Sequence, residues 1–110
     1  MAASGRVLCS HLVHMRIDGA ARAPEWANLE ELDAFGAVLA SERDWPTQIE
    51  VVIEAEGFAA PAFVQTCRRR ETDYAVTVEF TDGYRWDAQA WQPDHAYAAP
   101  SKANSAKAGG

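Results

Sequence analysis

The residues best suited to chemistry near the start of the chain are a cysteine, a serine and two histidines within six positions. Cys9, Ser10, His11 and His14 offer soft metal ligands and nucleophiles. A metal site needs three or four such groups to converge, but in a strand Cys9 and His11 face one way and His14 the other. A nucleophile needs a base within hydrogen-bond reach and a third group that orients it, and no motif here supplies them. The sequence therefore predicts neither a metal site nor an enzyme.

The densest basic cluster is a run of three arginines, Arg68 to Arg70. Arginine clusters bind phosphate groups when several guanidinium groups converge. Here the run lies at the end of an expected strand, where alternation sends neighbouring side chains to opposite faces. The acidic residues Glu71 and Asp73 follow immediately. We therefore interpret the run as the solvated tip of a hairpin.

Composition limits the broad class of protein. The chain has 110 residues, 48% of them hydrophobic, which suits one small domain with one core. Its net charge of -6 would repel polyphosphate, so we expect no nucleic-acid polymer as partner. No run of eighteen apolar residues and no signal-like start occur, so we expect no membrane insertion and a cytoplasmic location.

Cys9 and Cys67 lack C-x-x-C spacing and are expected to be buried thiols; a disulfide would require neighbouring strands.

Four segments show the alternation of apolar and polar residues that is typical of half-buried strands. They cover residues 7–17, 49–55, 61–69 and 74–80. The polar turn from Arg70 to Asp73 is short enough to join the last two as a hairpin. Residues 24–43 are different, because their large apolar residues recur every three or four positions and Pro24 suits a first helical turn. This spacing predicts an amphipathic helix, although Gly36 interrupts it; the apolar positions are Trp26, Leu29, Leu32, Phe35 and Leu39.

The order of these pieces resembles the PilZ domain, in the divergent form found in single-domain bacterial proteins. The matching text covers about residues 7–95 and reads CSHLVHMRI, WANLEELDAFGAVLAS, IEVVIEAEGFAAPAFVQTCRRRETDYAVTVEF and DGYRWDAQAWQPDH. Its more specific parts are an N-L-E-E-L-x-x-x-G-A turn, a hairpin ending in V-x-F, and D-G-x-R-W. The resemblance implies an all-β fold, a small six-stranded antiparallel β-barrel. It also implies strands at 26–33 and 37–41, joined by a turn at 34–36, in place of the helix.

Many PilZ domains bind cyclic di-GMP through an N-terminal Arg-x-x-x-Arg and an Asp/Asn-x-Ser-x-x-Gly between the second and third strands. Guanidinium groups fork onto phosphate and stack on guanine, acidic or amide groups accept guanine N–H donors, and glycine permits close approach. In this chain Glu31 takes the Asp/Asn place, Asp33 the serine place, and Gly36 matches. Arg6 is the only arginine ahead of the first strand, so the first motif is absent. The resemblance makes Arg6, Glu31, Asp33 and Gly36 the candidate ligand residues.

The carboxylate of Asp33 bears on whether such a ligand binds. At about 5 Å and an effective dielectric near 20, each carboxylate–phosphate pair costs roughly 3 kcal/mol. That is about a hundredfold in affinity, unless Asp33 faces guanine donors. We therefore expect a PilZ-like signalling or regulatory module with degenerate ligand motifs that acts through contacts with a protein partner, with no cofactor. The alternative is a functional cyclic di-GMP receptor with a rebuilt, weaker site.

The C-terminal part divides into an aromatic segment and a tail. Tyr84, Trp86 and Trp91, with Pro93, are expected to form a short segment with a helical turn whose rings plug one end of the barrel. From residue 98 onward no large apolar side chain offsets the entropy of ordering. We therefore expect a barrel domain at residues 1–97 and a disordered tail at residues 98–110.

Overall fold

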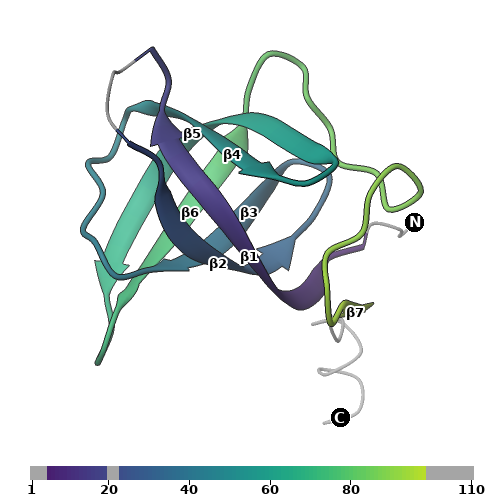
Figure 1. Cartoon of the computed structure of the whole chain (residues 1–110), viewed down its shortest axis with the longest axis horizontal. Coiled ribbons are helices and arrows are strands. Elements are labelled where there is room, and N and C mark those ends of the chain that lie inside the picture. The colour runs from purple at the N-terminus through teal and green to yellow at the C-terminus, as the bar shows by residue number, and fades with distance from the viewer. Residues whose placement is uncertain (1–4, 20–22, 99–110) are drawn as a thin grey trace, which may run out of the picture.

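The computed structural model describes residues 5–19 and 23–98. These residues form seven strands joined by turns and loops, and they contain no helix (Figure 1). None of these residues belongs to a helix that could cross a bilayer. The four strands predicted from alternation are confirmed, and the first has the expected bounds. The strands are β1 (Val7–Ile17), β2 (Glu25–Leu32), β3 (Gly36–Ser41), β4 (Glu50–Ala55), β5 (Phe58–Arg69), β6 (Tyr74–Phe80) and β7 (Tyr97–Ala98).

The strands close into a six-stranded antiparallel barrel, as expected from the resemblance. Their order is β2-β3-β6-β5-β4-β1, and pairing of β1 with β2 closes the ring. Figure 1 shows β1 crossing the barrel, and its two edges pair with β2 and with β4. The two-residue β7 extends the edge of β1, where Val7 pairs with Ala98 and Leu8 with Tyr97. Closure leaves the six main strands without a long free edge.

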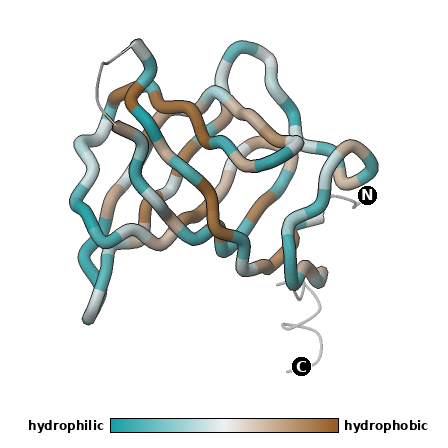
Figure 2. Tube along the Cα trace, viewed as in Figure 1, coloured by the Kyte–Doolittle hydropathy of each residue, from teal (hydrophilic) through white to brown (hydrophobic). Residues whose placement is uncertain are grey.

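The core fills the inside of the barrel with alternate side chains from all six strands. Figure 2 shows hydrophobic stretches on the strands and a hydrophilic end to the β5–β6 hairpin. Burying such side chains is the main favourable contribution to folding. The largest fully buried side chains are Met15, Leu29, Leu32, Leu39, Ile53, Val13, Val51, Val64, Val76 and Val78.

The helix predicted over residues 24–43 is wrong, and the alternative of two strands joined by a turn is confirmed. The register of β2 against β3 shifts between Leu29 and Glu31, which marks a β-bulge. Because the bulge adds one residue, successive inward-facing side chains are three positions apart here instead of two, and Leu29 and Leu32 both face the core. Trp26 and Phe35, which a helix would bury, are exposed. The helix-like spacing therefore arises from a bulge and two surface aromatics.

The C-terminal aromatic segment packs against the core where β5 begins and β6 ends. Tyr84 contacts Phe58 and Phe80 edge to face, and Trp91 stacks on Phe58 with ring centroids 4.3 Å apart. Trp86 is buried and donates from Nε1 to the carbonyl of Trp91 at 2.9 Å. The expected helical turn is a single hydrogen-bonded turn at residues 88–90. These rings lie at one end of the barrel, as the sequence predicts.

The remaining sequence expectations concern the tail and the cysteines. Ala98, placed at the start of the tail, pairs with Val7 in the sheet, and the rest of the predicted tail lies outside the described residues. Cys9 on β1 and Cys67 on β5 are both half-buried free thiols. Because β4 lies between β1 and β5, the two cysteines are not on neighbouring strands.

Candidate functional site

One surface pocket brings together the four residues that the resemblance selects. Its volume is about 350 Å³, near the lower end of the range for small-molecule sites. It lies over the turn between β2 and β3 and over the outer faces of β5 and β6. The lining consists of Arg6, Glu31, Leu32, Asp33, Phe35, Gly36, Ala37, Val38, Gln65, Thr77, Val78 and Glu79.

Arg6 lies at the pocket but is already paired. Its Nη1 is 3.1 Å from Oε1 of Glu31, and both side chains are partly exposed. The register explains this contact, since Val7 pairs with Leu32 and Leu8 with Glu31 in the adjacent strands. An exposed pair of this kind contributes at most about 1 kcal/mol. A strong anion could therefore displace Glu31, but in this structure the arginine is neutralised.

Asp33 shapes its own turn. Its Oδ1 accepts the backbone N–H groups of Phe35 at 2.8 Å and Gly36 at 2.9 Å. The backbone N–H of Asp33 donates to the carbonyl of Gly36 at 3.0 Å. Aspartate often closes turns by accepting main-chain donors in this way. One of the two carboxylate oxygens of Asp33, Oδ1, is therefore engaged by the β2–β3 turn.

Gly36 is required by the close approach of β3 to β6. A Cβ at Gly36 would overlap the backbone carbonyl oxygen of Val78. Gly36 pairs with Glu79, the next residue along β6. The φ angle of Gly36 is not in the left-handed region, so the constraint is space rather than backbone conformation. Its role in this fold is explained without a ligand.

The charge balance at the pocket is negative. Among the lining residues one guanidinium, that of Arg6, stands against the carboxylates of Glu31, Asp33 and Glu79, which leaves two negative charges. Glu79 accepts a hydrogen bond from Nε2 of Gln65 at 3.0 Å. Sequence reasoning missed Glu79 and Gln65, because they reach the pocket through the pairing of β3 with β6 and of β6 with β5.

An exposed aromatic ring with a cation on it forms part of the pocket lining. Phe35 is 60% exposed, and the guanidinium carbon of Arg85 lies 4.7 Å from the centre of its ring. The backbone holds this turn, since Phe80 donates to the carbonyl of Phe35 and Trp86 to that of Ala34. Arg85 also donates to the carbonyl of Tyr84 at 2.7 Å. The sequence did not predict the contact between Arg85 and Phe35. Its only sequence signal is the D-G-x-R-W text, which contains Arg85.

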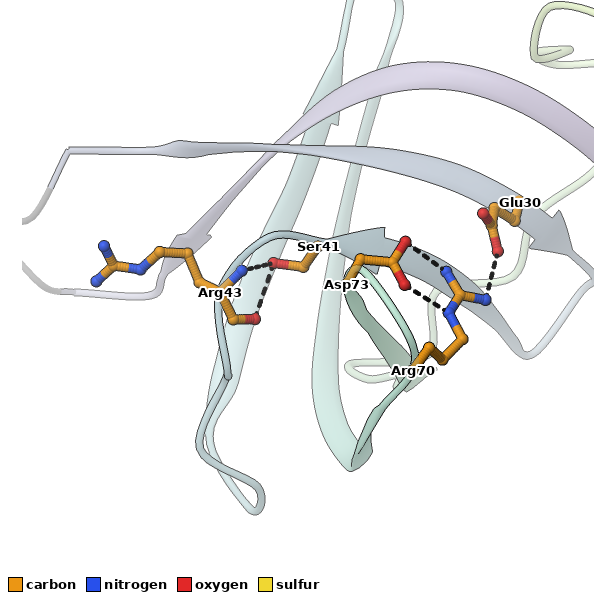
Figure 3. A network of polar contacts seen from close by, with 5 residues as sticks. All are labelled: Glu30, Ser41, Arg43, Arg70 and Asp73. Carbon is orange, nitrogen blue, oxygen red and sulfur yellow. Dashed lines mark hydrogen bonds and ion pairs between the residues drawn. The ribbon is translucent and has the colours of Figure 1, made fainter.

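The arginine run lies at the β5–β6 hairpin, and its last member is committed there. Arg70 makes two hydrogen bonds to the carboxylate of Asp73, at 2.7 and 2.8 Å, and one to Glu30 at 3.3 Å (Figure 3). These hydrogen bonds raise the pKa of Arg70 and hold the pKa of Asp73 below its ordinary value. Arg68 has no polar partner among the described residues. The guanidinium carbon of Arg69 lies 6.0 Å from the centre of the Tyr74 ring, so the guanidinium groups of the run have no polar partner in common.

The cysteine and the two histidines of β1 are engaged separately. Cys9 donates to the carbonyl of Leu29 at 3.4 Å, and burial, followed by the charges of Glu30 and Glu31, raises its thiol pKa to about 11. A thiol with this pKa is protonated and unreactive at neutral pH. His11 accepts the backbone N–H of Asp94 at Nδ1, while the ring of His14 lies against Trp26. No group of three metal ligands occurs among the described residues.

The fold and this pocket define a small closed antiparallel β-barrel with an acidic surface pocket at one strand turn. Comparisons of the chain with protein-family models, with curated proteins and with solved structures find no match.

Proposed function

We propose that this chain is a PilZ-like signalling or regulatory module, related to cyclic di-GMP receptors, that acts through contacts with a protein partner. The closed six-stranded barrel supports the proposal, as does the sequence text that resembles PilZ domains. We favour a protein partner over a nucleotide ligand on one observation, which is that the candidate ligand residues already have partners within the chain. Arg6 is paired with Glu31, and Asp33 serves the β2–β3 turn.

The charge at the pocket argues against tight binding of a dianion. Cyclic di-GMP carries two phosphates, and the lining of the pocket carries two net negative charges. At about 5 Å and an effective dielectric near 20, each uncompensated carboxylate costs roughly 3 kcal/mol. A receptor normally offsets such costs with unpaired guanidinium groups that fork onto the phosphates. A binding module with a degenerate pocket fits these charges better than a nucleotide receptor does.

A second candidate function is a cyclic di-GMP receptor with a rebuilt, weaker site. The observation that favours it is the guanidinium of Arg85 on the exposed ring of Phe35, beside the pocket. A purine could stack on such a platform, and phosphate could compete with Glu31 for Arg6. In this reading Arg85 replaces one arginine of the missing N-terminal motif.

We also propose that the protein has no catalytic role and no resident metal or cofactor, and that it is located in the cytoplasm. Cys9, the strongest nucleophile in the N-terminal cluster, is kept as a thiol by its raised pKa. His11 lacks the arrangement of a catalytic base, because its Nδ1 accepts a main-chain N–H group.

Calorimetric titration of the purified protein with cyclic di-GMP, at low and at moderate salt, tests the choice between the two functions. The proposed function predicts no heat of binding at millimolar ligand. Micromolar binding that Arg85→Ala abolishes would establish the receptor instead. Arg68→Ala is the matched control, because it removes an arginine that has no polar partner among the described residues and does not line the pocket.

A further inference from the structure

The outer face of the β1–β2 pair carries an apolar ridge formed by Leu12, His14 and Trp26. Leu12 and Trp26 are 57% and 59% exposed, and the ring of His14 lies 3.8 Å from that of Trp26, centre to centre. Their adjacency follows from the register, since His14 pairs with Trp26 and Leu12 with Asn28. The solvent face of an antiparallel sheet is usually polar. A cluster of large apolar groups there is typical of an interaction surface.

Two grooves flank this ridge, and both are lined by Leu12 and Trp26. The first, about 770 Å³, runs over β2 and β3 toward the β5–β6 hairpin. The second, about 360 Å³, lies between β1 and the β4–β5 turn. It opens there because β1 pairs with β4 only from His14 onward. A segment of another chain could therefore place side chains on both sides of Trp26.

The rims of these grooves are acidic. The described lining residues of the two grooves include five carboxylates and one guanidinium, that of Arg43. Ion pairs engage three of the carboxylates; the pairs are Arg43 with Glu25, Arg16 with Glu54, and Arg70 with Asp73.

Two carboxylates are left over, one at each groove. The side chains of Glu42, at the first groove, and Glu56, at the second, make no polar contact with a described residue. Carboxylates beside an exposed tryptophan favour a cation, both by direct pairing and through the face of the ring. The surface thus offers an apolar anchor with an unpaired negative charge on either side.

We propose that this ridge and its two grooves are the docking surface for a cationic segment of a partner protein. The segment carries an apolar side chain that packs on Leu12 and Trp26, with lysine or arginine within a few residues on both sides to reach Glu42 and Glu56. This inference rests on the proposed function, for which it names the working surface and the chemistry of the partner. A second copy of this chain fits poorly, because two acidic faces would meet and each chain carries a net charge of -6.

The test is a selection from a random peptide display library on the purified full-length protein. We expect selected peptides to be enriched in lysine and arginine around an apolar residue. Fluorescence polarisation with a labelled selected peptide then measures its Kd for the variants. Trp26→Ala should weaken binding by about tenfold or more. Glu42→Gln and Glu56→Gln should each weaken it roughly two- to fivefold, with the effect reduced at high salt.

Tyr97→Ala is the matched control, because Tyr97 is an equally exposed aromatic, at 62%, outside both grooves. Trp26 points outward, so its removal should leave the fold intact, which circular dichroism checks.

Peptides that bind Trp26→Ala as tightly as the original protein but fail on Phe35→Ala would overturn this surface and leave a protein-binding function standing. No selected peptide, together with tight cyclic di-GMP binding in calorimetry, would overturn both proposals. Self-association through this ridge, seen as a dimer that Trp26→Ala dissociates, would replace the cationic partner by a second copy.

Discussion

At the scale of single residues, the β2–β3 turn uses for its own folding the groups that a nucleotide site would need. Asp33 accepts two backbone N–H groups of the turn, and Gly36 makes room for the carbonyl oxygen of Val78. Arg6 has Glu31 as its partner. The carboxylate accepts those turn hydrogen bonds strongly, since charged acceptors make the stronger hydrogen bonds. Asp33 therefore closes the turn and also adds a negative charge to the lining of the pocket.

Gly36→Ala should destabilise the protein by roughly 2 kcal/mol, because the added methyl group must displace the β6 backbone at Val78. Urea denaturation measures the loss. Gly83→Ala is the comparison, since Gly83 has a φ of +74° but nothing within 4 Å of an added Cβ, so only backbone strain of about 1 kcal/mol is expected. A smaller loss for Gly36→Ala than for Gly83→Ala would contradict the steric role of Gly36.

Cys9 should react slowly with iodoacetamide in the folded protein. Its pKa is raised to about 11, chiefly by burial, so the thiolate is scarce at pH 8. In a Cys67→Ser background we expect alkylation at least about tenfold slower than in urea-unfolded protein. The raised folded pKa also means that the stability supplied by the neutral thiol is present below pH 9 and is lost as pH rises through about 11. Equal rates for folded and unfolded protein would exclude this account.

At the scale of elements, strand periodicity could be predicted where the strands are regular and could not where they bulge. The alternation of Val7–Ile17 gave the bounds of β1, and the polar residues 70–73 gave the β5–β6 turn. In β2 the bulge after Leu29 shifts the inward face by one residue, and the resulting spacing matches a helix. Only the resemblance to a known domain predicted two strands there, because periodicity alone cannot distinguish a bulge from a helical turn.

The candidate pocket could be predicted in part for a similar reason. The four residues named from the sequence line one pocket, and three of them are close together in the chain. Glu79 and Gln65 join them only through the pairing of β6 with β3 and of β5 with β6. Register between distant strands is set by packing and bulges across the whole sheet. The register between distant strands therefore cannot be predicted from the local pattern of residues in a single sequence.

The β5–β6 hairpin should depend on Arg70 in a pH-dependent way. Arg70→Gln should lower the stability of the protein at pH 7, because Arg70 ties Asp73 to Glu30. The hydrogen bonds of Arg70 lower the pKa of Asp73 below 3.8. A depressed folded pKa contributes stability that is present above the unfolded value and is lost as pH falls through the folded one. The difference between the original protein and the variant should therefore shrink below about pH 4.

Urea midpoints measured at pH 7, 5 and 3 check this prediction. Arg68→Gln is the matched control, since Arg68 lies on the same hairpin and has no polar partner among the described residues. A constant difference for Arg70→Gln at all three pH values would show that Arg70 acts by packing rather than by charge.

At the scale of the whole molecule, closure of the barrel couples its two ends. Trp45 lies at one end, where its Nε1 donates to Ser41 at the end of β3. Trp86 lies at the other end, where its backbone N–H donates to Ala34 just before β3 begins. Both indoles are buried against the same hydrophobic core. Since every main strand pairs with two others, neither end can open without loss of ladder hydrogen bonds that the other end shares.

The protein should therefore unfold in one cooperative transition that includes the C-terminal aromatic segment. Trp45→Phe leaves Trp86 and Trp91 as the packed indoles of the aromatic end, and the double variant Trp86→Phe/Trp91→Phe leaves Trp45 as the buried indole of the opposite end. Trp26 is exposed in the folded protein, so its fluorescence should change little on unfolding. Within each variant, tryptophan fluorescence and far-ultraviolet circular dichroism should give the same urea midpoint, as expected for a small two-state domain. Comparing two signals within one variant removes the effect of the substitution on stability. If fluorescence of Trp45→Phe changed at lower urea than the circular dichroism, the aromatic segment would unfold separately from the barrel, and the two ends would not be coupled.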